Sequence, residues 1–322
     1  MNLLRRTIAV VVVTAVVVVA LVGSMRIGWW DTDYETVRAR WAAPPSTFVN
    51  IDGVNVHVRS EGRGPVVLML HGSILNMHEW NPVADRLKDR FRVVRLDWPP
   101  YGFTEPDPRG ILTTPRAADI VAGLVEHLDL EPFTILATSN GVNVALDYYA
   151  RYPDRVRAMA LSVLPLERPS QTRKVDWRIR AMGWFHSRFL PDYHSKYWWR
   201  LIFEDTTPAG FSPPDEMVDM TYDANNLPGA AQRQREYIAS NVELFRTTDM
   251  GAVAEQVTVP VLLQWCEQDT VIYQTLDATI ERFSQAPLTV ISYPQFGHFP
   301  MWEDPDLFTA DLEKFLNSLD SG

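Results

Sequence analysis

The feature that most limits the fold is an uncharged stretch over residues 7–25, which contains two runs of four valines. These 19 residues, at about 1.5 Å per helical residue, span roughly 28 Å, close to the hydrocarbon thickness of a bilayer. A segment embedded in lipid must satisfy its backbone hydrogen bonds internally, so it has to be helical even though valine is a mediocre helix former in water. We therefore expect residues 1–25 to form an N-terminal transmembrane anchor.

The flanks of this segment bear on its orientation. Arg5 and Arg6 precede it, and Trp29 and Trp30 follow it, which is typical of a positive cytoplasmic flank and an interfacial aromatic anchor. These flanks favour a single-pass protein whose remaining chain is extracytoplasmic (periplasmic or extracellular), whereas three arginines between residues 26 and 40 argue the other way. Two alternatives stay open: a signal peptide cleaved near Gly23, which would give a secreted protein, and a buried core element.

The composition excludes several classes of protein. The 322 residues are 46% hydrophobic, which is ordinary for a globular chain, and the net charge of -10 makes a nucleic-acid partner improbable because phosphate binding needs surplus Lys and Arg. The single cysteine, Cys266, cannot form an intramolecular disulfide. The first 25 residues hold two arginines and no acid, so the remainder is still more acidic. Such a remainder is poorly suited to anionic lipid, which leaves the apolar helix as the expected membrane attachment.

Strand-like and helix-like segments alternate along the rest of the chain. The segment 48–58 reads as two alternating strands joined at Asp52-Gly53, a hairpin signal. Short apolar runs follow at 66–70, 91–96, 133–137, 156–163, 261–265 and 288–293, and helical patterns lie between or after them at 116–128, 142–152 and 307–319. Strands that alternate with helices predict an α/β fold with a mostly parallel, doubly wound sheet.

The alternation is interrupted once, between about Pro165 and Pro260, where apolar and aromatic residues recur at helical spacing without a strand signal. We interpret this segment as an inserted helical cap. The predicted organisation is an anchor or signal segment at 1–25, a linker at 26–47, a core made of 48–164 and 257–322, and the cap at 165–256.

Ligands of an open α/β sheet bind at the carboxyl ends of its strands, so polar residues that follow apolar runs are the first candidates for a site. Ser139 comes directly after the run 133–137 and before a helical pattern, which places its hydroxyl at a sharp strand-to-helix corner. Backbone N–H groups at such a helix N-terminus can stabilise a developing oxyanion. The alternative is that Ser139 only caps the helix, since serine is also a favoured N-cap.

Around Ser139 the sequence resembles the α/β-hydrolase superfamily. The stretch Ala137-Thr-Ser-Asn-Gly141 is similar to the G-x-S-x-G nucleophile elbow, with Ala137 in place of the first glycine. His71-Gly72-Ser73 resembles the oxyanion loop of that family. The resemblance implies that Ser73 and Asn140 donate the oxyanion-hole N–H groups and that His71 is structural.

Further matches to the same family continue along the chain. Residues 97–104, with Pro100 replacing a glycine, resemble a loop-shaping motif, which gives Asp97 a structural role. Cys266-Glu-Gln-Asp269 resembles the G-x-x-D that supplies the triad acid and implies Asp269 rather than Glu267. Residues 297–305 resemble the G-H-x-x-x-x-E-x-P signature, which implies His298 as the general base. The order Ser139, Asp269, His298 is the order typical of this fold.

The resemblance implies a serine hydrolase that cleaves carboxylic esters, with apolar or lipid-like acyl groups expected, through an acyl-enzyme. The alternatives are a C–C bond hydrolase of ring-cleavage diketones and a non-catalytic ligand-binding protein of the same fold. Neither a metal nor an organic cofactor is expected, because no metal-ligand pattern such as H-E-x-x-H is found.

The cap holds 13 aromatic residues between 166 and 256. They can form the cap's own core, or some of them, Trp184, Trp198 and Trp199 in particular, can line an apolar acyl pocket or touch the membrane. The expected partners are therefore a small-molecule ester and a membrane reached through the N-terminal helix. The oligomeric state is not readable from the sequence.

Overall fold

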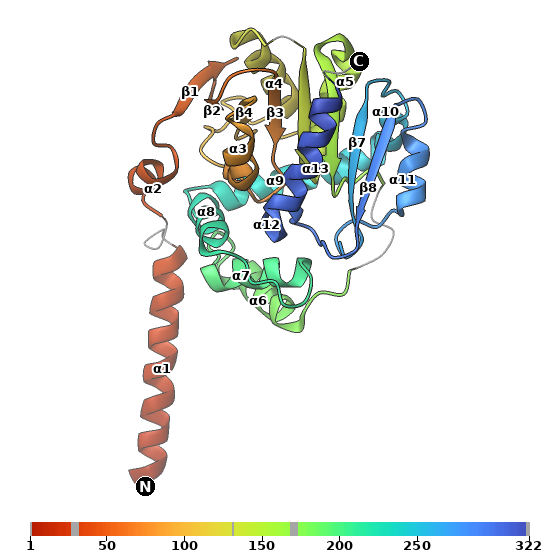
Figure 1. Ribbon diagram of the computed structural model, residues 1–322. Helices are drawn as coiled ribbons and strands as arrows, with labels where there is room; N and C mark the ends of the chain where they lie inside the picture. Colours follow the sequence, from red (N-terminus) through yellow and green to blue (C-terminus); the bar gives the residue numbers. More distant parts are fainter. Residues whose placement is uncertain (1, 27–31, 131, 168–172, 320–322) are drawn as a thin grey trace.

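A mixed eight-stranded sheet forms the centre of the molecule in the computed structural model, which describes residues 2–26, 32–130, 132–167 and 173–319 (Figure 1). The strand order is β1-β2-β4-β3-β5-β6-β7-β8, in which β1 and β2 pair antiparallel, β2 and β4 pair antiparallel, and the other neighbours are parallel. The strands are β1 Ser46–Ile51, β2 Val54–Glu61, β3 Val66–Leu70, β4 Arg92–Leu96, β5 Phe133–Thr138, β6 Val156–Ser162, β7 Val261–Cys266 and β8 Leu288–Tyr293. The predicted α/β fold and the Asp52-Gly53 hairpin are confirmed.

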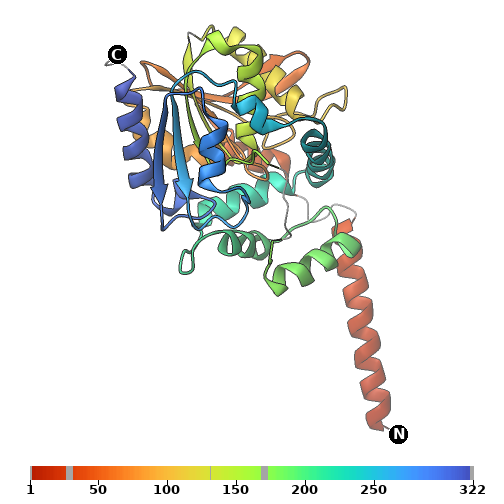
Figure 2. The same ribbon diagram turned by 90° about the vertical axis from the view of Figure 1, so that its right-hand side faces the viewer.

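Helices cover both faces of this sheet, as the doubly wound reading predicts (Figures 1 and 2). Outside the segment between β6 and β7 they are η1 Met77–Trp80, α3 Asn81–Leu87, α4 Thr114–His127, α5 Asn140–Arg151, η2 Pro153–Arg155, α11 Leu276–Arg282, α12 Pro300–Glu303 and α13 Pro305–Ser318. The helices α4 and α5 pack into one hydrophobic cluster with the sheet, and α3 and α13 pack into the cluster on the other face.

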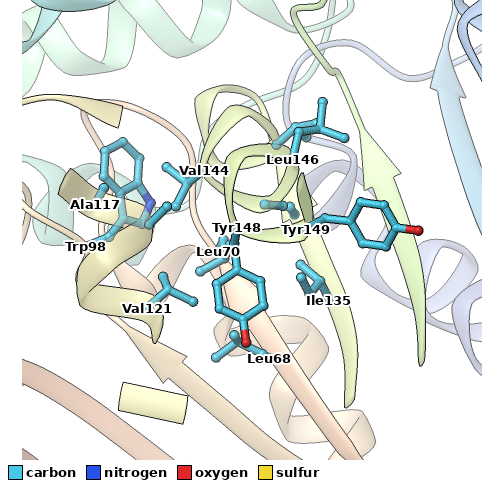
Figure 3. Close-up of a cluster of buried hydrophobic side chains, with 14 of the residues drawn as sticks. Leu68, Leu70, Trp98, Ala117, Val121, Ile135, Val144, Leu146, Tyr148 and Tyr149 are labelled. Atoms are coloured by element: carbon cyan, nitrogen blue, oxygen red, sulfur yellow. The ribbon is translucent and has the colours of Figure 1, made fainter. Parts of the chain in front are cut away.

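The helix that follows the central strand β5 is fixed by the first of these clusters. Figure 3 shows Val144 and Tyr148 of α5 among Leu68 and Leu70 of β3 and Val121 of α4, and all five are buried. Apolar residues spaced along one face of α5 therefore hold its N-terminal end firmly at the end of β5. This packing positions residue 139, the last residue before the helix.

The described part of the segment between β6 and β7 contains helices joined by loops and no strand, and we refer to residues 165–256 as the cap. Its helices are α6 Trp177–Phe189, α7 Lys196–Thr206, α8 Asp215–Asn225, α9 Ala230–Thr247 and α10 Met250–Ala254. The short α10 packs on α5 and α11, so the last turn of this segment belongs to the core by its contacts. Helices α6 and α7 lie beyond the carboxyl ends of the parallel strands (Figure 1).

The N-terminal helix α1, Asn2–Arg26, projects away from the rest of the molecule (Figures 1 and 2). Of the helices in the described part of the chain, one, over Arg5–Met25, is long and apolar enough to cross a membrane, and its apolar window is not buried. A membrane span and a signal sequence both have this length and composition. The expected interfacial residues Trp29 and Trp30 lie outside the described residues.

The described part of the predicted linker, from Thr32 onward, contains a short helix and the start of β1. Within it, Tyr34–Trp41 form α2, which begins at Asp33 because that carboxylate accepts the N–H of Thr36 at 2.8 Å. Val37 and Trp41 are buried, and the indole N–H of Trp41 donates to Asp223 of α8 at 2.8 Å. The helix α2 is thereby attached to α8 of the cap. Its signal in the sequence was short, with one capping residue and two apolar residues four apart.

Candidate active site

The carboxyl ends of β3, β5, β7 and β8 meet at one edge of the sheet and bring the predicted site residues together. A cavity of about 260 Å³ opens there, and its lining includes Ser139 and His298. The whole lining is Gly72, Ser73, Ile74, Leu75, Glu79, Thr138, Ser139, Asn140, Ile202, Thr206, Val271, His298 and Phe299. It thus combines a serine, a histidine and the two predicted oxyanion-hole residues with an apolar wall.

Ser139 occupies the corner between β5 and α5. Its backbone has φ 49° and ψ -134°, a conformation that L side chains rarely adopt. Strain of this kind costs about 1–3 kcal/mol and persists only where the surroundings impose it. Its side chain makes no capping hydrogen bond to the helix, so the structure does not support the N-cap reading. The hydroxyl is therefore not committed to the backbone of α5.

Two glycines let the chain close tightly around this corner. A Cβ on Gly141 would lie 2.5 Å from the carbonyl oxygen of His71, and a Cβ on Gly72 would lie 3.1 Å from Cβ of Ser139. The end of β3 and the first turn of α5 are consequently in direct backbone contact. Ala137, which replaces the family's first glycine, is fully buried in β5 and leaves the corner intact.

His298 and Asp269 form a buried hydrogen-bonded pair, with Nδ1 of the imidazole 2.9 Å from Oδ2 of the carboxylate. Burial lowers the pKa of His298, but the charge and hydrogen bond of Asp269 more than offset this, so the pKa lies above the ordinary histidine value. Burial raises the pKa of Asp269, yet the same pair brings its pKa below the ordinary value. The rival Glu267 is exposed and accepts a hydrogen bond from Ser292 instead.

A second carboxylate holds the loop that carries this histidine. Glu303 accepts the N–H of Gly297 at 2.7 Å and the N–H of Phe299 at 2.9 Å, so it grips the backbone on both sides of His298. The N–H of His298 donates to the carbonyl of Thr206, at the end of α7, at 3.0 Å. The glutamate of the G-H-x-x-x-x-E-x-P signature thus has a visible structural role, and the cap is tied to the histidine loop.

The predicted oxyanion-hole residues also lie side by side. The side-chain NH₂ of Asn140 donates to Oγ of Ser73 at 2.7 Å, and the side-chain oxygen of Asn140 accepts from the side chain of Asn241 in α9 at 3.1 Å. These contacts fix the two loops relative to each other. The N–H of Asn140 belongs to the first turn of α5, where backbone donors have no partner inside the helix.

Sequence reasoning missed Glu79, a buried carboxyl in the same cavity. It is 1% exposed, and its Oε2 accepts the N–H of Gly72 at 2.7 Å. Burial raises the pKa of Glu79 to about 7, against the opposing influence of the Gly72 hydrogen bond and of His298. Glu79 lies in η1, a helix of four residues that is too short to show a burial pattern in the sequence, so only the folded structure reveals its burial.

Asp97 and His71 have the structural roles that the sequence predicts. Asp97 is fully buried, accepts the N–H groups of Met77 and Phe103 at 2.7 Å each, and pairs with His57 at 2.8 Å. His71 is also fully buried, and its Nδ1 lies 2.7 Å from the carbonyl of Gly72. Burial lowers the pKa of His71 to about 4, which keeps this imidazole neutral.

A larger cavity of about 470 Å³ lies in the cap and shares Ile74 and Ile202 with the smaller one. Its lining is Ile74, Gly183, His186, Ser187, Pro191, His194, Trp198, Trp199, Ile202, Asn225, Ala231, Gln234, Arg235 and Ile238. Trp198 and Trp199, predicted as pocket residues, are therefore part of it. Trp184 lines neither cavity and is 65% exposed.

Within the described residues, no group of three or more His, Cys, Asp or Glu side chains could hold a metal ion. The acids and histidines of the site are instead hydrogen-bonded to each other or to the backbone. The arrangement can supply a hydroxyl, an imidazole held by a carboxylate, and backbone donors around one cavity.

Comparison with known proteins gives a family match over residues 65–305, to the model of the alpha/beta hydrolase fold. A curated relative from Mesorhizobium japonicum, 2-(acetamidomethylene)succinate hydrolase, is 29% identical over 84% of this chain and 94% of its own length. The pimeloyl-[acyl-carrier protein] methyl ester esterase of Nitrosospira multiformis is 24% identical over 81% of this chain and 98% of its own length.

Among solved structures, a bacterial membrane phospholipase A has a similar fold, with a TM-score of 0.71. The match covers 99% of both chains at 18% sequence identity. The relatives and the structure thus agree on the fold and differ in the compounds their names describe.

Proposed function

Since this chain belongs to the α/β-hydrolase family, we propose that it is a serine hydrolase that cleaves carboxylic esters with apolar acyl groups. The observation that carries the proposal is the cavity at the carboxyl edge of the sheet. Ser139 stands on a strained corner at that cavity, and His298, held by Asp269, lines the same space. Strained corners and a base oriented by an acid are the features that nucleophilic catalysis requires.

In the proposed mechanism His298 takes the hydroxyl proton of Ser139 while Oγ forms a bond to the ester carbonyl carbon. The N–H groups of Ser73 and Asn140 bind the oxyanion of the tetrahedral intermediate, and Asp269 stabilises the imidazolium. His298 then gives the proton to the departing alkoxide, which leaves as the alcohol. A water attacks the acyl-enzyme and gives its proton to His298, and collapse of the second intermediate releases the acid and returns the proton to Ser139.

The preference for apolar acyl groups is supported by the walls of the two cavities. We call the cavity lined by Ser139 and His298 the catalytic cavity and the larger one the cap cavity. Ile74 and Ile202 line both of them, and Trp198 and Trp199 add apolar surface to the cap cavity. None of the described residues that line the catalytic cavity is Lys or Arg. A neutral ester with a hydrocarbon chain therefore suits this space better than a polyanion does. The ester and phospholipid substrates named for two similar proteins are in line with this choice.

A C–C bond hydrolase of ring-cleavage diketones is the second candidate. A helical cap inserted at the same place in the chain would serve either activity. The curated relative named for a succinate derivative also shows that sequences at this level of similarity can act on substrates other than simple esters.

We also propose that α1 is an uncleaved anchor with the catalytic domain outside the cytoplasm. The helix is uncharged over residues 7–25, its two runs of four valines are exposed, and Arg5 and Arg6 precede this stretch. The fold match to a structure described as a membrane phospholipase covers 99% of this chain, which supports this reading. A reporter fused after Gly322, active only on one side of the membrane, tests the orientation.

The activity is tested with the full-length chain and its Ser139→Ala variant, on a series of p-nitrophenyl esters and on a vinylogous diketone. We expect ester turnover by the wild type and a loss of about 10⁶-fold in the variant. Trapping of Ser139 by an organophosphonate, read by mass spectrometry, tests the nucleophile directly. Diketone cleavage alone would favour the second candidate, and equal, negligible turnover by both proteins would leave a ligand-binding protein.

A further inference from the structure

Helix α6 of the cap has two apolar faces, and only one of them is covered by protein. Ile179 and His186 are buried on the inner face. On the opposite side, Trp177, Trp184 and Phe185 are 72%, 65% and 37% exposed. Their spacing of seven and eight residues places them on one side of the helix. Large aromatic side chains gathered on a surface in this way mark a contact site, because single exposed apolar residues are ordinary but stripes are not.

The same helix is basic in an acidic protein. Arg178, Arg180 and Arg188 lie in α6, which contains no Asp or Glu, whereas the whole chain has a net charge of -10. Arg178 pairs with Asp176, the N-cap of the helix, at 3.1 Å. Tryptophan and phenylalanine combined with arginine are the composition of helices that lie in the interface of an anionic bilayer.

The chain that leaves α1 is attached to the part of the cap that contacts α6. The N–H of Thr32 donates to the carbonyl of Asn226 at 3.2 Å, and Asn226 in turn bonds the backbone of His194 through both side-chain atoms at 2.9 Å. The ring of His194 contacts that of His186 of α6, with 4.8 Å between centroids. The six Cα–Cα steps from Arg26 to Thr32 can reach at most roughly 21 Å. The end of α1 is therefore held close to the cap.

Both views agree with these contacts, since α6 lies at the end of the molecule from which α1 projects (Figures 1 and 2). We propose that the exposed face of α6, formed by Trp177, Trp184 and Phe185, rests in the headgroup region of the bilayer that α1 spans, on a surface rich in anionic lipid. The inference depends on the anchor role proposed for α1. A second copy of this chain is the competing occupant of the same face.

In this placement the cap cavity lies close to the lipid surface. Gly183 and His186 on the inner face of α6 line the cavity, and Trp184 lies between them in sequence on the outer face. A single helix thus separates the cavity from the proposed membrane surface. An ester with a long acyl chain would pass from the bilayer into the cap without crossing bulk water.

The test uses the full-length protein in vesicles of phosphatidylglycerol and phosphatidylcholine, with a nitroxide on the single-site variant Trp184→Cys. The matched control is Tyr152→Cys, an exposed aromatic at the far end of α5. Cys266 is buried, and labelling of the unmodified chain measures its background. Collision rates with oxygen and with a water-soluble nickel chelate report the surroundings of each label.

We expect the label at 184 to favour oxygen over nickel by several-fold relative to the label at 152, and more strongly as the phosphatidylglycerol fraction rises. Equal access of nickel to both labels in protein that floats with the vesicles overturns the inference and leaves the anchor intact. Low access of both reagents at 184 indicates a protein contact and also overturns it. Protein that does not float with the vesicles removes the anchor and the inference together.

A second measurement connects the surface to turnover. The double variant Trp177→Ala/Trp184→Ala is compared with Tyr152→Ala on an ester embedded in vesicles and on a water-soluble p-nitrophenyl ester. We expect a several-fold loss for the double variant on the embedded ester alone. Equal loss on both esters would show that α6 acts on the fold rather than on lipid. The nitroxide measurement needs no activity, so failure of the hydrolase proposal is distinguishable from failure of this one.

Discussion

Two histidine–aspartate pairs lie in the described part of the chain, in different regions and with nearly the same distance between nitrogen and oxygen. Nδ1 of His57, in strand β2, is 2.8 Å from Asp97, which directly follows β4, and Nδ1 of His298 is 2.9 Å from Asp269 beyond β7 and β8. The two pairs differ in what surrounds the imidazole. His57 is fully buried, with Phe48 and Phe103 against its ring, whereas His298 faces the cavity that Ser139 also lines.

The two pairs therefore differ in the surroundings of the second ring nitrogen, Nε2. Nε2 of His57 is buried without a hydrogen-bond partner among the described residues, so it has no substrate to act on. The carboxylate of Asp97 also bonds two backbone N–H groups, which fixes the neighbouring loop. A histidine–aspartate pair thus identifies a base only when the ring opens on a cavity with a nucleophile.

The largest effect is expected for Asp269→Asn. Loss of the carboxylate removes the charge that stabilises the imidazolium of His298 and the acceptor that orients its ring, so kcat should fall by about 10⁴-fold. The melting temperature should fall less than it does in Asp97→Asn, because the His298–Asp269 pair borders the cavity and its side chains are 9% and 5% exposed, whereas those of His57 and Asp97 are fully buried. Kinetics on a p-nitrophenyl ester and thermal unfolding of the same preparation give both readouts. A fall of less than tenfold would mean that His298 does not act as the base.

For Asp97→Asn the main loss should be in stability and not in kcat. Removal of one partner from a buried pair costs about 3–5 kcal/mol of unfolding free energy, and the kcat of the protein that stays folded should change little. Denaturant unfolding measures the loss.

The pH dependence checks the cause. Burial raises the pKa of Asp97, but His57 and the backbone donors offset this and hold the pKa at about 2, below its unfolded value. The stability that the ionised Asp97 adds to the folded state is fully present above the unfolded pKa. It is lost as pH falls from about 4 toward 2. The difference in stability between wild type and variant should narrow in that window, and a constant difference would show that the charge of Asp97 is not the cause.

The contrast between the pairs also marks the limit of sequence reading. Covered strands leave continuous apolar runs, and the buried β3 has the bounds expected from 66–70. β8 also has the bounds expected from 288–293, although it is an edge strand and largely exposed. The positions of Ser139, Asp269 and His298 followed from family motifs at the strand ends. His57 has no motif around it, because its partner is 40 residues away and their contact depends on the pairing of β2 with β4.

Other residues were missed because averages and local patterns hide them. The net charge argued against electrostatic contact with anionic lipid, yet α6 gathers three arginines and no acid on one helix. Trp184 fitted an aromatic pocket by its neighbours in sequence, but the rotation of α6 points it outward and leaves Gly183 and His186 at the cavity. Burial and helix rotation are set by tertiary packing, which a single sequence does not state.

A smaller effect is expected for Glu303→Gln, which tests the support of the His298 loop. The amide can accept one of the two N–H bonds that Glu303 accepts, and its NH₂ group faces the other donor. Displacement of the base should lower kcat by roughly 10–100-fold, since a shift of about 1 Å in a catalytic group can cost 10²-fold. KM should stay within about twofold if the substrate cavity is unchanged. A variant with unaltered kcat would show that the loop holds its shape without this carboxylate.

The smallest effect is expected for Glu79→Gln, and it appears in the pH profile. Burial raises the pKa of Glu79 to about 7, and its negative charge in turn raises the pKa of His298. The base must be neutral to accept a proton, so the rate rises with pH through the pKa of His298. The glutamine keeps an acceptor for the N–H of Gly72 but carries no charge, so the acidic limb should move to lower pH by less than about one unit. Glu267→Gln, an exposed acid outside the cavity, is the matched control and should leave the limb in place. An acidic limb that does not move in Glu79→Gln would mean that Glu79, like Asp97, only holds a loop in place and does not affect the pKa of His298.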